Sequence, residues 1–143
     1  MGILVDTWPQ PPAPIVDRLR ELAPDEAVYD DPQAVDPSAV ELLLAWRLRE
    51  PGLQRYPNLR LLAAASAGVE KLLAAPLPTG LPLVRTVDPA QNEQIAQFVT
   101  AIALGHLRDL ARYALQRQAR EWTRHPVVPA AASTVAVLGL GAA

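Results

Sequence analysis

The chain has no cysteine, no long hydrophobic run and no marked excess of either charge. The absence of cysteine excludes disulfides, thiolate metal sites and a cysteine nucleophile from these 143 residues, and it is consistent with a cytoplasmic protein. No stretch reaches the ~18 apolar residues of a membrane span, and the apolar residues 3–5 are too few for a signal peptide. We therefore expect a cytoplasmic protein that does not enter a membrane.

Charge and residue spacing exclude two further classes of function. Lys and Arg number 13 and Asp and Glu 15, which gives a formal net charge of −2. The chain therefore lacks the basic surface that nucleic acid requires. No spacing of ligands suggests a metal site. Half of the residues are hydrophobic and a fifth are charged, which is the composition of a globular protein with a real core.

Proline is abundant instead: its 15 residues are about twice the average usage. The prolines separate short apolar segments and so punctuate the elements. The segments expected to be strands are residues 2–7, 26–29, 40–46, 59–65 and 83–85. Helical segments are expected between them, at residues 15–22, 51–57 and 69–75. This alternation predicts an α/β fold, a doubly wound parallel sheet of the flavodoxin-like kind.

A long helix is predicted to begin after Asp88, with proline at its first position and Gln91 at its third. The pattern continues to about Trp122, roughly 45 Å at 1.5 Å per residue. Its apolar face is longer than a small sheet needs, so we expect another domain or subunit to pack on it. Residues 134–138 then predict a new strand, followed by Gly139 and Gly141.

A dinucleotide-binding fold begins with a strand that is followed by a glycine-rich turn. The first glycine permits a tight turn, and the second lets the backbone approach a pyrophosphate. The third glycine of that motif is missing here. A glycine-containing tail explains Gly139 and Gly141 equally well.

The loop after the fourth expected strand is a candidate binding site. It lies at the carboxyl end of a strand, where open α/β sheets bind ligands. The backbone N–H groups of Gly68 and Val69 could donate to a carboxylate, helped by the helix that begins there. An ordinary turn between a strand and a helix is the alternative. Arg47 and Arg85 also follow strands, but we expect solvated side chains for both.

Four motifs follow in order over the rest of the chain. Tyr56-Pro-Asn-Leu-Arg-Leu-Leu62 leads into a strand, which Ala65-Ser-Ala-Gly-Val-Glu70 follows. The long helix ends in Arg117-Gln-Ala-Arg-Glu-Trp122, and the strand with the glycine pair comes next. This order resembles the N-terminal portion of the D-isomer-specific 2-hydroxyacid dehydrogenases, whose loop reads GAGVD. Residues 45–46 and 92–94 resemble the glyoxylate/hydroxypyruvate reductase branch.

The resemblance implies an oxidoreductase that reduces a small 2-oxo acid to the 2-hydroxy acid with NADP or NAD. It implies that Trp46 lines the substrate pocket and that Ala67, Gly68 and Val69 bind the substrate, although Trp46 could equally be a core or interface residue. By the same resemblance Gln94 lies beneath the nicotinamide, and Gly139 and Gly141 bind the cofactor. Gln97 stands where much of the family has glutamate, so no role is carried over to it.

The resemblance places no catalytic residue in this chain. The family's acid–base histidine, with the glutamate that tunes it and the arginine that binds the carboxylate, falls after Ala143. We therefore interpret His106 and His125 as structural or exposed. Neither Ser66 nor Ser133 lies in the glycine-rich turn that a nucleophilic serine needs. The chain on its own is predicted to be inactive.

We expect three parts: residues 1–88 form the substrate-side domain, residues 89–123 a linking and dimerising helix, and residues 124–143 the start of a truncated dinucleotide-binding domain. A homodimer is expected, with a small 2-oxo or 2-hydroxy acid as ligand. The alternative function is a truncated, non-catalytic α/β module that dimerises through its long helix. A binding domain unrelated to dehydrogenases is a third interpretation.

Overall fold

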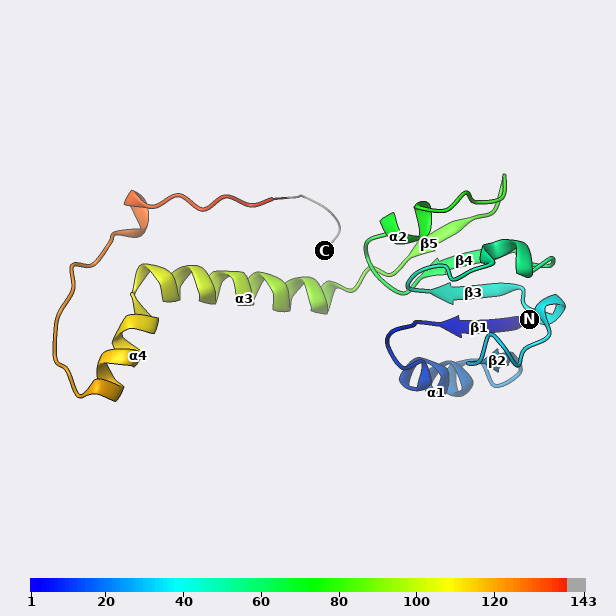
Figure 1. Cartoon of the computed structure of the whole chain (residues 1–143), viewed down its shortest axis with the longest axis horizontal. Coiled ribbons are helices and arrows are strands. Elements are labelled where there is room, and N and C mark those ends of the chain that lie inside the picture. Colours follow the sequence, from blue (N-terminus) through cyan, green and yellow to red (C-terminus); the bar gives the residue numbers. More distant parts are fainter. Residues whose placement is uncertain (139–143) are drawn as a thin grey trace. The chain divides into compact units, whose positions relative to one another are not determined.

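The computed structural model describes residues 1–138, which form two units. The first unit is Met1–Val87, and the second begins at Asp88. Figure 1 shows the sheet of the first unit and the helices of the second. The predicted division of the second unit into a linking helix and the start of another domain stays a prediction.

Five parallel strands form the first unit. They are β1 (Gly2–Asp6), β2 (Ala27–Tyr29), β3 (Leu42–Ala45), β4 (Leu61–Ala64) and β5 (Leu83–Arg85). Their order across the sheet is β2-β1-β3-β4-β5, and every neighbouring pair is parallel. This is the flavodoxin-like order. The predicted α/β doubly wound sheet is therefore confirmed.

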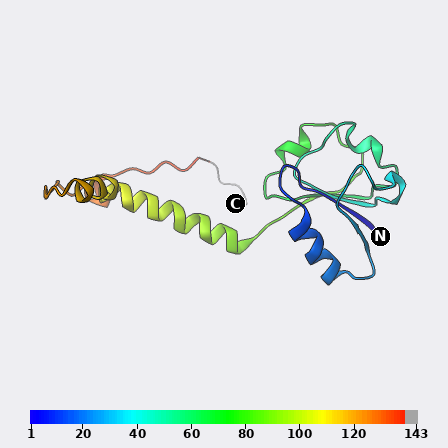
Figure 2. The same ribbon diagram turned by 60° about the horizontal axis from the view of Figure 1, so that its bottom comes forward.

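The two faces of the sheet have separate hydrophobic clusters, because successive side chains of a strand point to opposite faces. Helix α1 (Ala13–Leu22) packs Val16 against Ile3, Val5 and Val28 on one face. On the other face, the short helices η2 (Gly52–Arg55) and α2 (Glu70–Leu73) contribute Leu53 and Leu72 to the larger cluster, which also contains Leu4, Leu43 and Leu62. The short helix η1 (Pro37–Ala39) precedes β3 and buries no residue. Figure 2 shows α1 on one side of the sheet and α2 on the other.

The predicted single long helix is wrong, since the described residues form two α-helices where it was expected. Helix α3 (Pro89–Leu107) begins where Asp88 accepts a hydrogen bond from the Ala90 N–H at 3.0 Å. It ends at Leu107, and Asp109, whose φ of 53° is left-handed, directly precedes α4 (Leu110–Ala119). Aspartate adopts this conformation more readily than most residues, which explains why the break falls there.

The strand predicted at residues 134–138 is also not formed in the described part of the chain. After the short helix η3 (Ala130–Ala132) these residues have no regular structure. A strand needs a neighbour to accept and donate its backbone hydrogen bonds, and no described strand pairs with this segment. Gly139 and Gly141 lie outside the described residues.

No helix within residues 1–138 is both long enough and apolar enough to cross a membrane.

Candidate functional site

The strand order places a crevice at the carboxyl ends of β1 and β3. Strand β2 lies on one side of β1 and β3 on the other, so the direction in which the strands are added across the sheet reverses between β1 and β3. Open parallel sheets bind ligands at such a point. Thr7 follows β1, Trp46 follows β3 and Ser66 follows β4, so all three lie along one edge of the sheet.

Trp46 lies half-buried beside the crevice. Its backbone N–H donates to the carbonyl oxygen of Asp6 at 3.3 Å, which holds the start of its loop against β1. The amino group of Lys71, in α2, lies 4.6 Å from the centre of the Trp46 ring. A lysine at this distance from an indole makes a cation–π contact. Trp46 is therefore joined to the helix that follows the candidate binding loop.

The loop of residues 66–69 is tied down at its start. The Ser66 hydroxyl donates to the carbonyl oxygen of Gly68 at 2.7 Å. Thr86, after β5, donates its N–H to Ser66 O at 3.3 Å and its hydroxyl to Ala64 O at 2.9 Å. Ala67 and Val69 are half-buried and Gly68 is exposed. The loop is thus anchored to the ends of two strands.

The backbone N–H groups of Gly68 and Val69 donate to no acceptor among the described residues. In the peptide between them, the carbonyl of Gly68 is held by Ser66, and a trans peptide points its N–H the opposite way. The Ser66 contact therefore fixes the direction of the Val69 N–H. Two unused donors on an anchored loop are suited to binding a carboxylate.

Two charged side chains, Glu70 and Lys71, lie beside this loop, where the sequence analysis considered only the helix. Helix α2 has only four residues, so it has less of a dipole than a longer helix. A Cβ built on Gly68 would lie 2.6 Å from Oε2 of Glu70, which shows that this carboxylate lies against the loop. Glu70 disfavours a bound anion, and Lys71, the only lysine of the chain, favours one. The sequence analysis did not consider Lys71, although its position two residues after Val69 was a usable signal.

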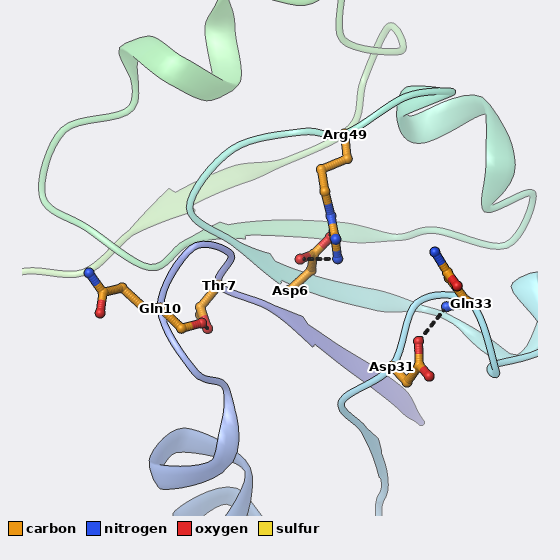
Figure 3. Close-up of polar contacts among 6 residues, drawn as sticks. All are labelled: Asp6, Thr7, Gln10, Asp31, Gln33 and Arg49. Carbon is orange, nitrogen blue, oxygen red and sulfur yellow. Dashed lines mark hydrogen bonds and ion pairs between the residues drawn. The ribbon is translucent and has the colours of Figure 1, made fainter.

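The arginines of the loop after β3 are ordered, contrary to the prediction for Arg47. Its guanidinium carbon lies 3.8 Å from the centre of the Trp8 ring. Arg49 donates to both carboxylate oxygens of Asp6, from Nη2 at 2.7 Å and from Nε at 3.0 Å, as Figure 3 shows. This fork clamps the end of β1 to the loop after β3. Arg85 is exposed, as expected.

The remaining predicted residues lie in the second unit. Gln94 is exposed in the first turns of α3, and Gln97 donates to Glu93 at 3.0 Å. His106 is exposed near the end of α3. The His125 N–H donates to the Tyr113 hydroxyl at 3.0 Å, and His125 Nε2 lies 3.1 Å from Gln116 Oε1. Among residues 1–138 no group of acidic, histidine or cysteine side chains could hold a metal ion.

Comparison with known proteins agrees with this fold. No family model matches the chain. A curated relative, glyoxylate/hydroxypyruvate reductase A of Yersinia enterocolitica, is 30% identical over 114 residues, which are 74% of this chain and 36% of the relative. The relative of that name in Serratia proteamaculans is 30% identical over 117 residues, with 76% of this chain and 37% of the relative covered. The chain thus spans little more than a third of the length of these relatives.

Two solved structures are similar over most of the chain. An NADPH-dependent glyoxylate/hydroxypyruvate reductase from Sinorhizobium meliloti, in complex with NADP and sulfate, gives a TM-score of 0.75 at 27% identity, with 91% of this chain and 42% of that chain covered. A probable 2-hydroxyacid dehydrogenase from Rhizobium etli, in complex with NADP, HEPES and L(+)-tartaric acid, gives 0.74 at 29% identity, with the same coverage.

Fold and sequence together relate the chain to the D-isomer-specific 2-hydroxyacid dehydrogenases over most of its own length. Within that class, the curated relatives are named glyoxylate/hydroxypyruvate reductase A. The family resemblance predicted from the loop at residues 65–70 and its neighbouring motifs is confirmed.

Proposed function

We propose that the chain supplies the substrate-side domain of an oxidoreductase that reduces a small 2-oxo acid, such as glyoxylate or hydroxypyruvate, to the 2-hydroxy acid. The unused N–H groups of Gly68 and Val69, on an anchored loop beside Trp46, carry the proposal. The names of the relatives support the reaction. The whole enzyme's activity belongs to the proposal, because the relatives are much longer than this chain.

Each residue of the loop has a role in the proposal. Gly68 and Val69 donate their N–H groups to the carboxylate of the acid, and Ala67 and Gly68 leave room for it to approach the backbone. The ring of Trp46 forms one wall of the site and excludes water from it. Lys71 attracts the anion, and its contact with Trp46 orients that ring.

The cofactor in this proposal is NADP or NAD, which supplies the hydride. Three of the solved relatives contain NADP or NADPH. Gln94 would lie beneath the nicotinamide, and Gly139 and Gly141 would approach the pyrophosphate. The described residues include no complete dinucleotide-binding fold.

The chain by itself is expected not to turn over substrate. The first unit, which contains the loop at residues 66–69, has no histidine among its residues, and Glu70 and Lys71 are the ionisable residues that follow the loop directly. A general acid must reach the oxygen that it protonates. Cofactor-dependent reduction of glyoxylate by a pure preparation of this chain would contradict this part of the proposal.

Binding of the acid can be measured without turnover. We expect isothermal titration with glyoxylate or hydroxypyruvate to show saturable binding, and Lys71→Gln to weaken it by roughly threefold to tenfold, in line with ~1 kcal/mol for an exposed charge. Arg18→Gln, an exposed arginine on α1, is the matched control and should bind as the wild type does. Equal affinities for all three proteins, or no binding at all, would contradict the proposed site.

A non-catalytic module that dimerises through its helix is the second candidate, and the apolar surface of α3 favours it. No residue of α3 is buried, and Phe98 and Ile102 are 66% and 60% exposed. Neighbouring exposed apolar side chains on one helix typically mark an interaction surface. Light scattering should give the mass of a dimer, and Phe98→Ser should reduce it to that of a monomer while Gln91→Ser does not. If the wild-type chain were a monomer, this would contradict the dimer that is expected for both the oxidoreductase and the non-catalytic module.

A further inference from the structure

A pocket lies at the same edge of the sheet, between the end of β1 and the loops that follow β2 and β3. Its volume is about 150 Å³. Its lining includes Asp6, Arg47, Arg49, Arg55 and Tyr56. It opens at the same crevice as the candidate substrate site, at the carboxyl ends of β1 and β3, but neither Trp46 nor the loop at residues 66–69 lines it.

Positive charge predominates in the lining of this pocket. Three arginines, at positions 47, 49 and 55, face two carboxylates, Asp6 and Glu50. Arg49 is already paired with Asp6, because the two carboxylate oxygens of Asp6 accept hydrogen bonds from its Nε and Nη2. The side chain of Asp6 is only 10% exposed. Arg49 therefore serves to hold the pocket's wall together, and two arginines are left over.

Arg47 and Arg55 make no ion pair with any described residue. Both are half-buried. The Trp8 ring fixes the guanidinium of Arg47 but accepts none of its in-plane hydrogen bonds, and its Nε is buried without an acceptor. A partly desolvated arginine without an anion is unfavourable. An anion in the pocket would satisfy both side chains.

Tyr56 adds a neutral donor to the pocket. Its side chain is buried, and its hydroxyl makes no hydrogen bond with the described residues. Burial raises the pKa of this hydroxyl, while the nearby Arg55 acts in the opposite direction. The phenol thus keeps its proton at neutral pH and can donate it to an oxygen.

We propose that this pocket binds a small oxoanion, a phosphate or carboxylate group, through Arg47, Arg55 and the hydroxyl of Tyr56. Guanidinium groups recognise both kinds of group, since their paired N–H donors match two oxygens. A volume of about 150 Å³ accommodates a group of this size. The proposal does not depend on the oxidoreductase function, because it uses different residues.

Nuclear magnetic resonance of the arginine side chains tests the proposal on the whole chain. Inorganic phosphate and oxalate are added separately, and the Nε–Hε signals of Arg47 and Arg55 should shift saturably with at least one of them. A response to phosphate only assigns phosphate chemistry to the pocket, and a response to oxalate only assigns carboxylate chemistry. Absence of a saturable shift with both anions overturns the proposal.

Variants locate the binding. We expect Arg55→Gln to weaken the affinity at least tenfold and Tyr56→Phe to weaken it severalfold, while Arg18→Gln, outside the pocket, leaves it unchanged. Tyr56→Phe keeps the buried ring, so it tests the site even where Arg55→Gln impairs folding. A loss of affinity in Arg18→Gln as large as that in Arg55→Gln would show that the anion binds by general charge and would overturn the proposal. An affinity of Tyr56→Phe equal to that of the wild type would also overturn it.

Discussion

The two units of the chain differ in how they use their apolar residues. In the first unit, Leu4, Val40 and Leu62 have no exposed surface. In the second, neither α3 nor α4 buries a single residue, although α3 contains ten apolar side chains in the range Pro89–Leu107 when alanine is counted. Capping and local propensity are enough to form a helix. A core additionally requires another surface to pack against.

The largest expected effect comes from removing a core leucine of the first unit. Leu62→Ala should lower the free energy of unfolding by about 2–5 kcal/mol, because it deletes fully buried methyl groups and leaves a cavity. Leu104→Ala makes the same substitution in α3, where the side chain is 52% exposed. It should change the free energy of unfolding by less than about 0.5 kcal/mol. Urea denaturation measures both. Equal losses would contradict the difference between the units.

Breaking the clamp between β1 and the loop after β3 should have an intermediate effect. Asp6→Asn removes the charge that accepts both bonds from Arg49, and should cost about 1–3 kcal/mol of unfolding free energy, discounted because Arg49 is 40% exposed. Asp17→Asn, at an exposed position of α1, is the matched control and should have little effect. A neutral result for Asp6→Asn would show that the clamp adds nothing to stability.

A smaller effect is expected from the anchor of the binding loop. Ser66→Ala removes the hydrogen bond to Gly68 O, worth about 1 kcal/mol, and frees the peptide that carries the Val69 N–H. Glyoxylate should then bind severalfold more weakly, and hydrogen exchange at Val69 should be faster. Ser133→Ala, which loses a longer contact of 3.4 Å in the second unit, should leave both unchanged. Unaltered binding in Ser66→Ala would show that the hydroxyl does not position the loop.

The smallest effect concerns Asp36, which caps η1 in the first unit. Hydrogen bonds from the N–H and the hydroxyl of Ser38 lower the pKa of Asp36 below its ordinary value. A lowered folded-state pKa contributes stability above the unfolded pKa of about 4, and this contribution is lost as pH falls through the folded value. Ser38→Ala should move the pKa of Asp36 part of the way back, as carbonyl-carbon titration can measure. An unchanged pKa would contradict the hydroxyl's part in the shift.

The sequence predicted the first unit well because its signals are local. Continuous apolar strands and the prolines between them predicted all five strands to within about two residues, and their alternation with helices, joined by right-handed crossovers, predicted the doubly wound parallel sheet. The helix break was missed because one left-handed residue, Asp109, interrupts a pattern that otherwise continues. The strand at residues 134–138 was predicted from its composition, but a strand also depends on a neighbour.

The candidate site was predicted only in part. The position of the loop at residues 66–69 followed from its place after a strand. Contacts between distant residues could not be predicted, such as Lys71 on Trp46, Arg47 on Trp8 and the fork between Asp6 and Arg49. These depend on the directions of side chains around the sheet edge, which spacing along the chain does not determine.

Amide resonances of the chain during titration with glyoxylate test the central claim most directly. If the loop at residues 66–69 holds the carboxylate, the N–H signals of Gly68 and Val69 should shift most, together with the indole N–H of Trp46. Half-saturation should occur at the same concentration for all three. Saturable shifts elsewhere without any at Gly68 and Val69, or no saturable shift in the chain, would contradict the account.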